Sequence, residues 1–381
     1  MRRIRKALLF LCACMICTPC IIASGPKLIA KINRSLWPYT INSAVEFDFA
    51  SKMEMLVFVE VFQQYEKITV EDSIKKHLGI EKISIPSINA WKEQVKKTIL
   101  SNFESLKGHS DHDFIEIQKP LIWKQLVTIA GTMEKAIPEN LKVWRMNAKD
   151  FYVSYIYEQM RLAALFPRIT SEIMTLQSSE TNGFNYGDKQ FLLTFDDGPT
   201  VANGNTDKLI TTLKKNNFNG VFFVLGDYFN VRLKASSVKQ MHELYKNMVI
   251  GSHGKEHKQH TKYDAWQFSL SYTNHLIDSV APENTKTKYF RPPYGQRNDK
   301  IITYLSQNNS SVMLWNIDSQ DWNAKISSKE VADRVITLML LWRKGILLFH
   351  DIHPKANEAL PIVWETLKCS SINWMDAKKL D

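Results

Sequence analysis

The chain has 381 residues, which is long for one average domain and sufficient for two. With 44% hydrophobic and 23% charged residues, its composition is that of an ordinary globular protein with enough apolar material for a sizeable core. The formal net charge is +10, but no cluster of basic residues interleaved with aromatic ones stands out, so we expect no nucleic-acid partner.

The N-terminus has the pattern of an export signal. Four basic residues and no acidic one lie between Met1 and Lys6, and 17 uncharged residues follow, from Ala7 to Ala23. This order, ending in small residues, is typical of a secretory signal peptide. Two alternatives stay open: an uncleaved membrane anchor, because the apolar run is only slightly short for a spanning helix, and lipidation at Cys14. We predict export, to the periplasm, the extracellular space or the cell envelope.

Loss of the segment 1–25 would remove four positive charges and no negative one, leaving about +6 with histidine neutral. A mildly basic exported protein suits an anionic envelope surface or cell-wall polymer. Membrane contact is expected only through the N-terminal segment, if it stays attached. Four of the five cysteines lie in this segment and only Cys369 follows it, so we predict no internal disulfide in the mature protein.

Residues 26–185 are predicted to form a mostly helical accessory domain of unknown role. One amphipathic face is marked by apolar residues spaced by four, four, four and three, namely Trp91, Val95, Ile99, Phe103 and Leu106. Thr69 and Asp72 have the spacing of a capping box that opens a short helix, and this helix is expected to end near Gly79.

A further helix is expected with Pro138 in its first turn and apolar residues recurring from Leu141 to beyond Leu165. The polar, glycine-containing stretch 177–189 then predicts a linker between two domains. For the helical half three roles stay open: covering the active site, binding another envelope protein, or driving self-association.

From residue 186 onward, short apolar runs alternate with segments long enough for crossover helices. The runs are Phe191–Phe195, Val221–Leu225, Met248–Gly251, Lys288–Phe290, Val312–Ile317 and Ile346–Phe349. One intervening helix is well marked, because Ser327 and Glu330 form a capping-box pair, apolar residues follow to Trp342, and Gly345 is expected to end it. The alternation predicts an α/β fold whose parallel sheet is closed, or nearly closed, into a barrel.

Chemically reactive side chains follow these predicted strands. They are Asp196 and Asp197 after the first run, His253 after the third, Arg291 after the fourth, Asp318 and Asp321 after the fifth, and His350 after the last. In barrel enzymes the C-terminal ends of the strands and the loops that follow them build the active site. Residues spread over 155 positions are therefore expected to converge on one mouth.

Five short motifs around these residues resemble the polysaccharide deacetylase family, also known as NodB-homology domains or carbohydrate esterase family 4. They read Thr194-Phe195-Asp196-Asp197-Gly198-Pro199, Ser252-His253-Gly254-Lys255-Glu256-His257, Arg291-Pro292-Pro293-Tyr294-Gly295, Asp318-Ser319-Gln320-Asp321-Trp322 and Leu347-Leu348-Phe349-His350-Asp351. The resemblance covers roughly residues 188–375, with the motifs in family order. It implies a catalytic domain over residues 186–381 with a distorted or incomplete (β/α) barrel of the NodB type, and it says nothing about residues 30–185.

The resemblance assigns one divalent metal ion to Asp197, His253 and His257. The two histidines are four residues apart, so a helical turn or a tight loop can direct both rings at one ion. Two histidines and one carboxylate leave positions open for water and substrate. Zinc is the usual metal of the family, while cobalt, nickel and manganese stay open on chemical grounds. Without the other motifs, such a histidine pair would be read as a solvated helix face.

The resemblance also gives roles to the catalytic groups. Asp196 would accept a proton from the attacking water, with Arg291 as the charge partner that keeps it ionised. The backbone N–H of Tyr294 would stabilise the oxyanion. His350 would protonate the leaving amine, while Asp321 raises its pKa and orients its ring.

Four further residues are assigned to substrate binding. Pro292 and Pro293 would fix the backbone that carries the oxyanion donor, and Trp322 and Leu348 would line a small pocket for the acetyl methyl group. For Leu348, plain core packing is nearly as good an interpretation. Asp318 is interpreted as a hydrogen-bond acceptor within its own loop.

One position departs from the family pattern. A serine or threonine usually follows the first histidine of the second motif and steadies its loop, whereas Gly254 follows His253 here, which predicts weaker metal binding or a looser loop. His260 and His353 match no family ligand and are predicted to lie at the rim. The stretch His109-Ser110-Asp111-His112-Asp113 has a metal-like composition, but we expect a solvated loop there.

Together these inferences predict an exported, metal-dependent N-deacetylase that acts on N-acetylglucosamine units of a β-linked glycan, with peptidoglycan favoured. Chitin-like oligomers, poly-N-acetylglucosamine and acetylated xylan stay open, and xylan would make the protein an O-acetyl esterase. The rivals are a hydrolase of a non-sugar amide and a catalytically weak glycan-binding or envelope scaffold protein. Retention of the reactive side chains of all five motifs argues against the scaffold.

Overall fold

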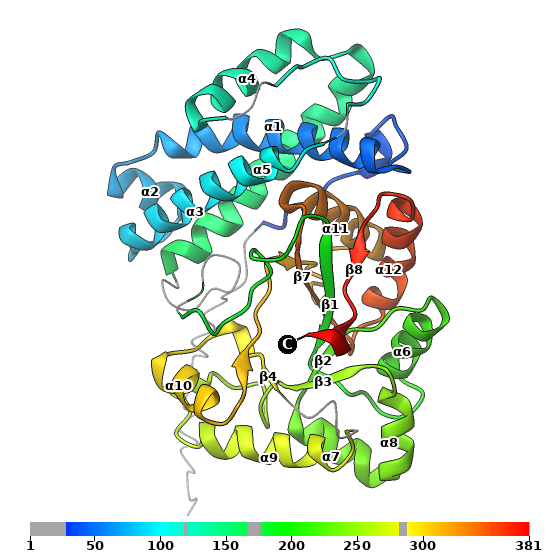
Figure 1. Cartoon of the computed structure of the whole chain (residues 1–381). Helices are drawn as coiled ribbons and strands as arrows, with labels where there is room; N and C mark the ends of the chain where they lie inside the picture. The colour runs from blue at the N-terminus through cyan, green and yellow to red at the C-terminus, as the bar shows by residue number, and fades with distance from the viewer. Residues whose placement is uncertain are drawn as a thin grey trace, which may run out of the picture.

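The computed structural model describes residues 28–107, 109–117, 121–165, 175, 177–281 and 288–380. The predicted export segment lies outside these residues. In Figure 1, helices α1 to α5 form a layer at the top, and a parallel sheet with further helices around it makes up the rest. Within the described ranges, no helix is long and apolar enough to cross a membrane.

The N-terminal part is mostly helical, as predicted. Its elements are η1 (Arg34–Leu36), α1 (Ala44–Glu66), α2 (Glu71–Leu78), α3 (Ile85–Glu104), α4 (Trp123–Ala136) and α5 (Glu139–Leu165). Helix α3 buries the predicted stripe from Trp91 to Phe103. Gly79 ends α2 in the left-handed region, with φ of 63°.

Two predicted helix starts are corrected by one residue each. No side chain caps α2, whose N-cap is Val70, so the capping box proposed for Thr69 and Asp72 is wrong. The acidic side chains in its first turn favour the helix through the dipole instead. Pro138 lies directly before α5 rather than in its first turn, and its carbonyl accepts the N–H of Leu141 at 3.0 Å.

The second part is an α/β fold built on a parallel sheet. Its strands are β1 (Gln190–Asp196), β2 (Val221–Val224), β3 (Val249–Ser252), β4 (Tyr289–Phe290), β5 (Ser311–Val312), β6 (Ile317–Asp318), β7 (Gly345–His350) and β8 (Asn373–Trp374). The strand order is β5-β4-β3-β2-β1-β7-β6, with β8 beside β1, and all pairs are parallel. Among the described residues, no pairing joins β5 to β6, so the barrel is incomplete, as predicted.

The apolar run Val312–Ile317 was expected to be one strand, and the structure divides it into β5 and β6. The carbonyls of Met313 and Leu314 accept hydrogen bonds from the guanidinium of Arg291, at 3.0 and 2.8 Å. Because these carbonyls bind a side chain, they are not available for hydrogen bonds to a neighbouring strand. The strand is interrupted between β5 and β6 at these residues.

Helices surround this sheet. They are α6 (Asn205–Lys215), α7 (Gly226–Ala235), α8 (Val238–Tyr245), α9 (Trp266–Asp278), α10 (Asp299–Gln307), α11 (Ser328–Trp342) and α12 (Pro354–Leu367), with short turns η2 (His260–Lys262), η4 (Pro293–Gly295) and η5 (Ala377–Lys379). The capping box of Ser327 and Glu330 opens α11, as predicted. The expected stop at Gly345 is corrected: Arg343 ends α11 with φ of 59°, and Gly345 is the first residue of β7.

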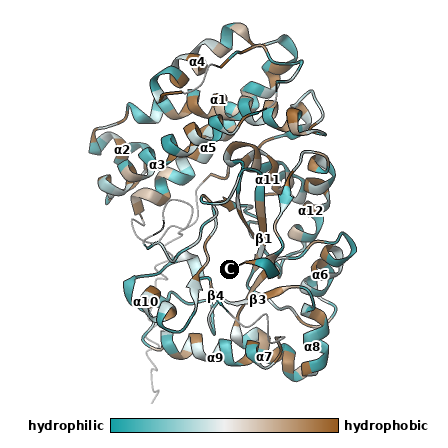
Figure 2. Cartoon of the chain, in the orientation of Figure 1, coloured by the Kyte–Doolittle hydropathy of each residue, from teal (hydrophilic) through white to brown (hydrophobic). Residues whose placement is uncertain are grey.

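Helix α11 joins the two parts of the molecule. Every residue from Val331 to Trp342 is buried, because α11 packs against α1 and α3 as well as against α12. In Figure 2 it is brown over most of its length. Buried apolar side chains of both parts form one continuous core cluster. The helical part therefore covers a face of α11 that would otherwise contact water.

The predicted linker, residues 177–189, is packed into the second part. Thr181 makes a parallel bridge to Met313, and buried Glu180 forms an ion pair with Arg297. The stretch connects the helices to β1 without being a free tether, and a domain boundary near residue 185 stays a prediction. Cys369 is free and exposed.

Candidate active site

The ends of parallel strands bring the predicted groups to one edge of the sheet. Asp196 ends β1 and lies in register with His350, the last residue of β7. Strands β3 and β4 pair at their last residues, so the residues that follow, His253 and Arg291, leave the sheet as neighbours. Convergence of the motifs on one edge follows directly from this parallel pairing.

Asp197, His253 and His257 form a cluster of three ligand-type side chains. Asp197 Oδ1 lies 3.4 Å from His253 Nε2 and 3.6 Å from His257 Nε2. His253 Nδ1 donates to the carbonyl of Arg291 at 2.7 Å, and its Nε2 faces the cluster. One ligand atom from each of these three residues lies within 4.8 Å of the other two, close enough for all three to hold one metal ion.

These residues fit a metal ion. Asp197 Oδ1 is buried and has no hydrogen-bond partner among the described residues. Ligands about 2.0–2.1 Å from a tetrahedral zinc ion lie about 3.4 Å apart, close to the separations found here. Burial and neighbouring His253 lower the pKa of His257 to about 4, so its ring is neutral, as a ligand must be. Burial raises the pKa of Asp197, but nearby histidines lower it more, and the carboxylate stays ionised.

Asp196 is the buried partner of Arg291. The guanidinium is fully buried, and its Nη1 donates to Asp196 Oδ1 at 2.8 Å and to Thr194 Oγ at 2.8 Å. It lies over the ring of Phe223, 4.2 Å from the centroid. These contacts fix the guanidinium, and the second oxygen of Asp196, 3.9 Å from His253 Nε2, is directed towards the ligand cluster.

His350 is held by both oxygens of Asp321. Its Nδ1 donates to Oδ1 at 2.8 Å, and its backbone N–H donates to Oδ2 at 2.8 Å. Burial lowers the pKa of His350, but the charge and hydrogen bond of Asp321, followed by the charges of Asp197 and Asp196, raise it to about 10. The ring is thus protonated at neutral pH, with Nε2–H free of Asp321 and able to donate a proton.

The remaining predicted site residues occupy the loops. Tyr294 has φ of 60°, and its ring is half exposed and packs edge-on against His257, with centroids 4.4 Å apart. Pro292 and Pro293 are buried beside it, and Trp322 is exposed. Leu348 is 4% exposed and belongs to a core cluster, so packing is its demonstrated role.

Asp318 accepts hydrogen bonds within its own loop, from the backbone and side chain of Gln320 at 2.8 and 2.9 Å. His353 is partly exposed, as expected of a rim residue. His260 is not at the rim: it is 1% exposed and lies beneath the loop that carries His257. The ring fills space that Gly254 leaves open, which corrects the prediction.

The stretch from His109 to Asp113 is only partly a solvated loop. His109 is exposed, but the side chain of Asp113 is buried in an ion pair with Lys52 on α1. His112 stacks on Tyr39, with ring centroids 3.9 Å apart. The stretch therefore anchors to the helical part rather than standing free in solvent.

Sequence reasoning gave no role to three polar residues around the site. Thr194 is fully buried within the apolar run Phe191–Phe195, and a lone polar residue in such a run is the signal that marks it. Asp351 is buried below Asp197, and burial raises its pKa to about 7. Thr206 donates to it at 2.7 Å, and an atom added at Gly198 would collide with its carboxylate.

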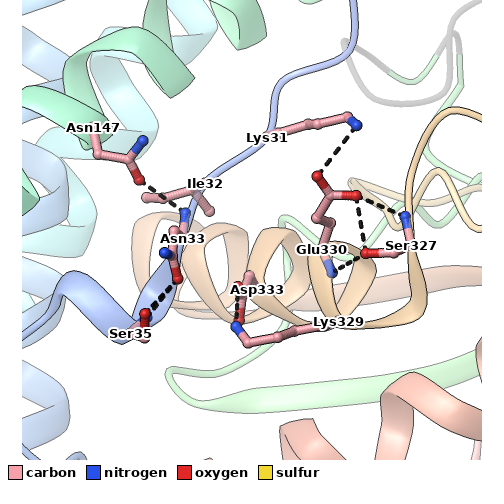
Figure 3. Close-up of a pocket in the computed structure, with 9 residues that line it drawn as sticks. All are labelled: Lys31, Ile32, Asn33, Ser35, Asn147, Ser327, Lys329, Glu330 and Asp333. Carbon is pink, nitrogen blue, oxygen red and sulfur yellow. Dashed lines mark hydrogen bonds and ion pairs between the residues drawn. The ribbon is translucent and has the colours of Figure 1, made fainter.

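A pocket of about 580 Å³ lies away from this site, between residues 31–35 and the start of α11. Figure 3 shows its charged residues directed at one another: Lys31 pairs with Glu330 at 3.2 Å, and Lys329 with Asp333 at 2.5 Å. These charges neutralise each other at the seam between the two parts.

Comparisons with known proteins give one matching family and several similar proteins. The sequence pattern of the family described as polysaccharide deacetylase matches residues 185–313. The peptidoglycan-N-acetylglucosamine deacetylase PgdA of Listeria monocytogenes is 31% identical over 199 residues, which cover 50% of this chain and 39% of that protein. The peptidoglycan-N-acetylmuramic acid deacetylase PdaC of Bacillus subtilis is 24% identical over 314 residues, covering 82% of this chain and 58% of that protein.

A crystal structure of the peptidoglycan N-acetylglucosamine deacetylase Bc1960 superposes with a TM-score of 0.46 at 23% identity, covering 52% of this chain and 90% of that one. The class of protein that the fold and the site define is an incomplete parallel α/β barrel with carboxylates and histidines at its strand ends. Through its C-terminal part, the chain is similar to the polysaccharide deacetylase family, of the NodB-homology or carbohydrate esterase family 4 type. The matched part of the chain spans 39% of the length of PgdA and 58% of the length of PdaC.

Proposed function

We propose that the protein is a metal-dependent N-deacetylase of a cell-wall glycan, with peptidoglycan as the favoured substrate. One observation carries the proposal: the Asp196–Arg291 and His350–Asp321 pairs adjoin the three-ligand cluster, which places a carboxylate paired with a guanidinium beside an imidazole whose pKa is raised to about 10. A base and an acid poised together are what amide hydrolysis requires.

Asp197, His253 and His257 would hold the metal, zinc being our first choice and cobalt, nickel or manganese the alternatives. When bound, the ion would lower the pKa of water and polarise the acetyl carbonyl. Asp196, held by the hydrogen bond from Arg291, would take the proton of the attacking water.

The acid step falls to His350. Its Nε2–H would protonate the sugar nitrogen as the C–N bond breaks, so that acetate and a free amine leave. Asp321 keeps the ring charged and fixes the tautomer. The backbone N–H of Tyr294, behind buried Pro292 and Pro293, would donate to the acetyl oxygen as charge develops there.

The named relatives support a cell-wall substrate. PgdA and PdaC are described as peptidoglycan deacetylases, on N-acetylglucosamine and N-acetylmuramic acid respectively. The sequence-predicted export segment would deliver this chain to the same compartment, the cell envelope. Exposed Tyr294 and Trp322 would offer flat rings beside the site for sugar rings, and a small pocket for the acetyl methyl would lie near Trp322.

The proposal is tested by acetate release from peptidoglycan and, separately, from chito-oligosaccharides, using purified residues 26–381 with zinc and after chelation. We expect release that chelation abolishes and zinc restores. Asp196→Asn should keep zinc and lose at least about a hundredfold in rate, since it removes the base. Acetate released equally well by Asp196→Asn or after chelation would contradict the mechanism, and zinc binding without acetate from either glycan would point to another amide or ester.

A further inference from the structure

The loop between the two histidine ligands, residues 254–256, has a glycine at its first position. Gly254 has φ of 85°, in the left-handed region. A Cβ added there would lie 2.5 Å from His260 Cε1 and 3.1 Å from Ser269 Oγ. The volume that a side chain at position 254 would take is therefore already filled by His260 and Ser269.

His260 is fixed at both ring nitrogens. Its Nδ1 lies 2.9 Å from the carbonyl of Lys258, which can only accept, so Nδ1 carries the proton. Nε2 then accepts from the hydroxyl of Ser269 at 3.0 Å. The ring is 1% exposed and packs edge-on against Phe290 on β4, with centroids 5.2 Å apart. One imidazole thus connects the loop, α9 and the sheet.

Ser269 closes the other side of the same loop. It is fully buried on α9, and its Oγ accepts the backbone N–H of Lys255 at 2.7 Å. The His260–Ser269 pair therefore holds peptide groups at Lys255 and Lys258, on either side of His257.

The first half of the loop has a separate support. The carbonyls of Gly254 and Lys255 accept backbone N–H groups of α7, from Gly226 and Asp227, at 2.9 Å each. The carbonyl of Lys258, next to the ligand, is instead held by His260. The His257 end of the loop is thus the part that depends on the buried pair.

We propose that His260 and Ser269 act as one pair of positioning residues, holding His257 in place for metal binding where Gly254 provides no side chain. The inference rests on the proposed metal site. Removal of a group that supports a metal ligand typically lowers metal affinity by about 10- to 100-fold. A loss of this size can be measured by titration with the metal.

The test is zinc affinity, measured by competition with a chromophoric chelator on the full mature chain. His260→Ala and Ser269→Ala should each weaken zinc binding about 10- to 100-fold. The double variant should be little weaker than the more affected single variant, because each change alone already breaks the pair. His275→Ala, which removes an exposed histidine from the same helix α9, should bind zinc like the wild type.

A second cycle tests the shared volume. Gly254→Ala should weaken zinc binding in the wild type and weaken it much less in a His260→Ala background, because the colliding ring is gone. The backbone strain of alanine at positive φ is present in both backgrounds and cancels in the comparison. Gln in place of His260 keeps an acceptor for Ser269, so His260→Gln should recover part of the affinity.

Circular dichroism and thermal unfolding of the metal-free variants separate loss of fold from loss of the loop geometry. Should His260→Ala not fold, Ser269→Ala and His260→Gln decide. Zinc affinities of these variants within about threefold of wild type, or additive losses in the double variant, overturn the inference. Wild type that binds no zinc overturns it together with the proposed function, whereas wild type that binds zinc and releases no acetate contradicts the function alone.

Discussion

Asp196 and His350 end neighbouring strands, and each has a buried partner of opposite charge type. A buried guanidinium donates to Asp196, while the carboxylate of Asp321 accepts from His350 and raises the pKa of its ring. At the scale of the residue, the proposed base and acid therefore differ in the charge of the side chain that lies 2.8 Å from each: a guanidinium beside Asp196 and a carboxylate beside His350.

Removal of the charge on Asp321 should change the pH profile. Burial lowers the pKa of His350, but the charge and hydrogen bond of Asp321 outweigh it and raise the pKa to about 10. The protonated, acid form therefore persists across the neutral range and is lost as pH rises through about 10. In Asp321→Asn this pKa should fall towards or below the ordinary 6.5, because burial then dominates. The alkaline limb of kcat/KM for acetate release should move down by more than two pH units, and an unmoved limb would contradict the assignment of His350 as the acid.

The Arg291–Asp196 pair makes a prediction about stability. Arg291→Met leaves a buried carboxylate without its partner and should lower the free energy of unfolding by about 3–5 kcal/mol. Adding Asp196→Asn removes that charge and should recover part of the loss, without recovering activity. Urea unfolding of the four matched proteins measures this, and a double variant no more stable than Arg291→Met would show that packing of the arginine, not its charge, is what matters.

At the scale of the element, helix ends show which sequence signals hold. The Ser327–Glu330 box closes with both reciprocal hydrogen bonds, whereas Thr69 and Asp72, at the same spacing, make none. The difference is where the N-cap falls, since α2 starts after Val70. At the other end of α11, side chains of the helical part serve as caps: Ser51 donates to the carbonyl of Leu340 at 2.6 Å.

The two boxes provide a matched test. Ser327→Ala should lower the free energy of unfolding by about 1 kcal/mol, because it removes the acceptor for an N-terminal N–H of α11. Thr69→Ala should change it by less than about 0.5 kcal/mol, as a surface substitution without a cap. Equal losses in denaturant unfolding would show that Thr69 also caps its helix.

At the scale of the whole molecule, the helical part is a cover for α11. Asn102 on α3 donates to the carbonyls of Leu341 and Trp342 at 3.1 Å each, and the indole of Trp342 donates to Tyr155. Arg334 on α11 pairs with Glu158 on α5 and donates to the carbonyl of Asp318. The helical part thus reaches, through one arginine, the loop that carries Asp321.

The cover predicts that the second part does not fold alone. Residues 186–381 would expose the apolar face of α11 and leave Arg334 without Glu158. We expect this fragment to be insoluble or to unfold without a cooperative transition, while residues 26–381 unfold cooperatively by calorimetry. A soluble fragment with a sharp transition and the same zinc affinity as the longer chain would instead establish a self-sufficient catalytic domain.

Much of the second part was predictable because its signals are local. Apolar runs of strand length mark five of the strands that the structure contains, and a parallel sheet then forces residues after those runs to one edge. The run Val312–Ile317 failed as a prediction because Arg291, distant in sequence, takes two of its carbonyls. β8 was missed because two residues carry no periodicity.

The sequence by itself determined the alternation of strand-length apolar runs with helix-length segments. It also determined the order of the five motifs, and hence the candidates for metal ligands, base and acid. Each of these signals depends on residues within a few positions of one another. Tertiary structure alone decided what surrounds them. The packing of the helical part on α11 joins residues far apart in the chain, and the burial of His260 beneath Gly254 depends on how the loop between them folds against α9 and β4. Such contacts depend on how faces meet in space, which spacing along a chain does not record.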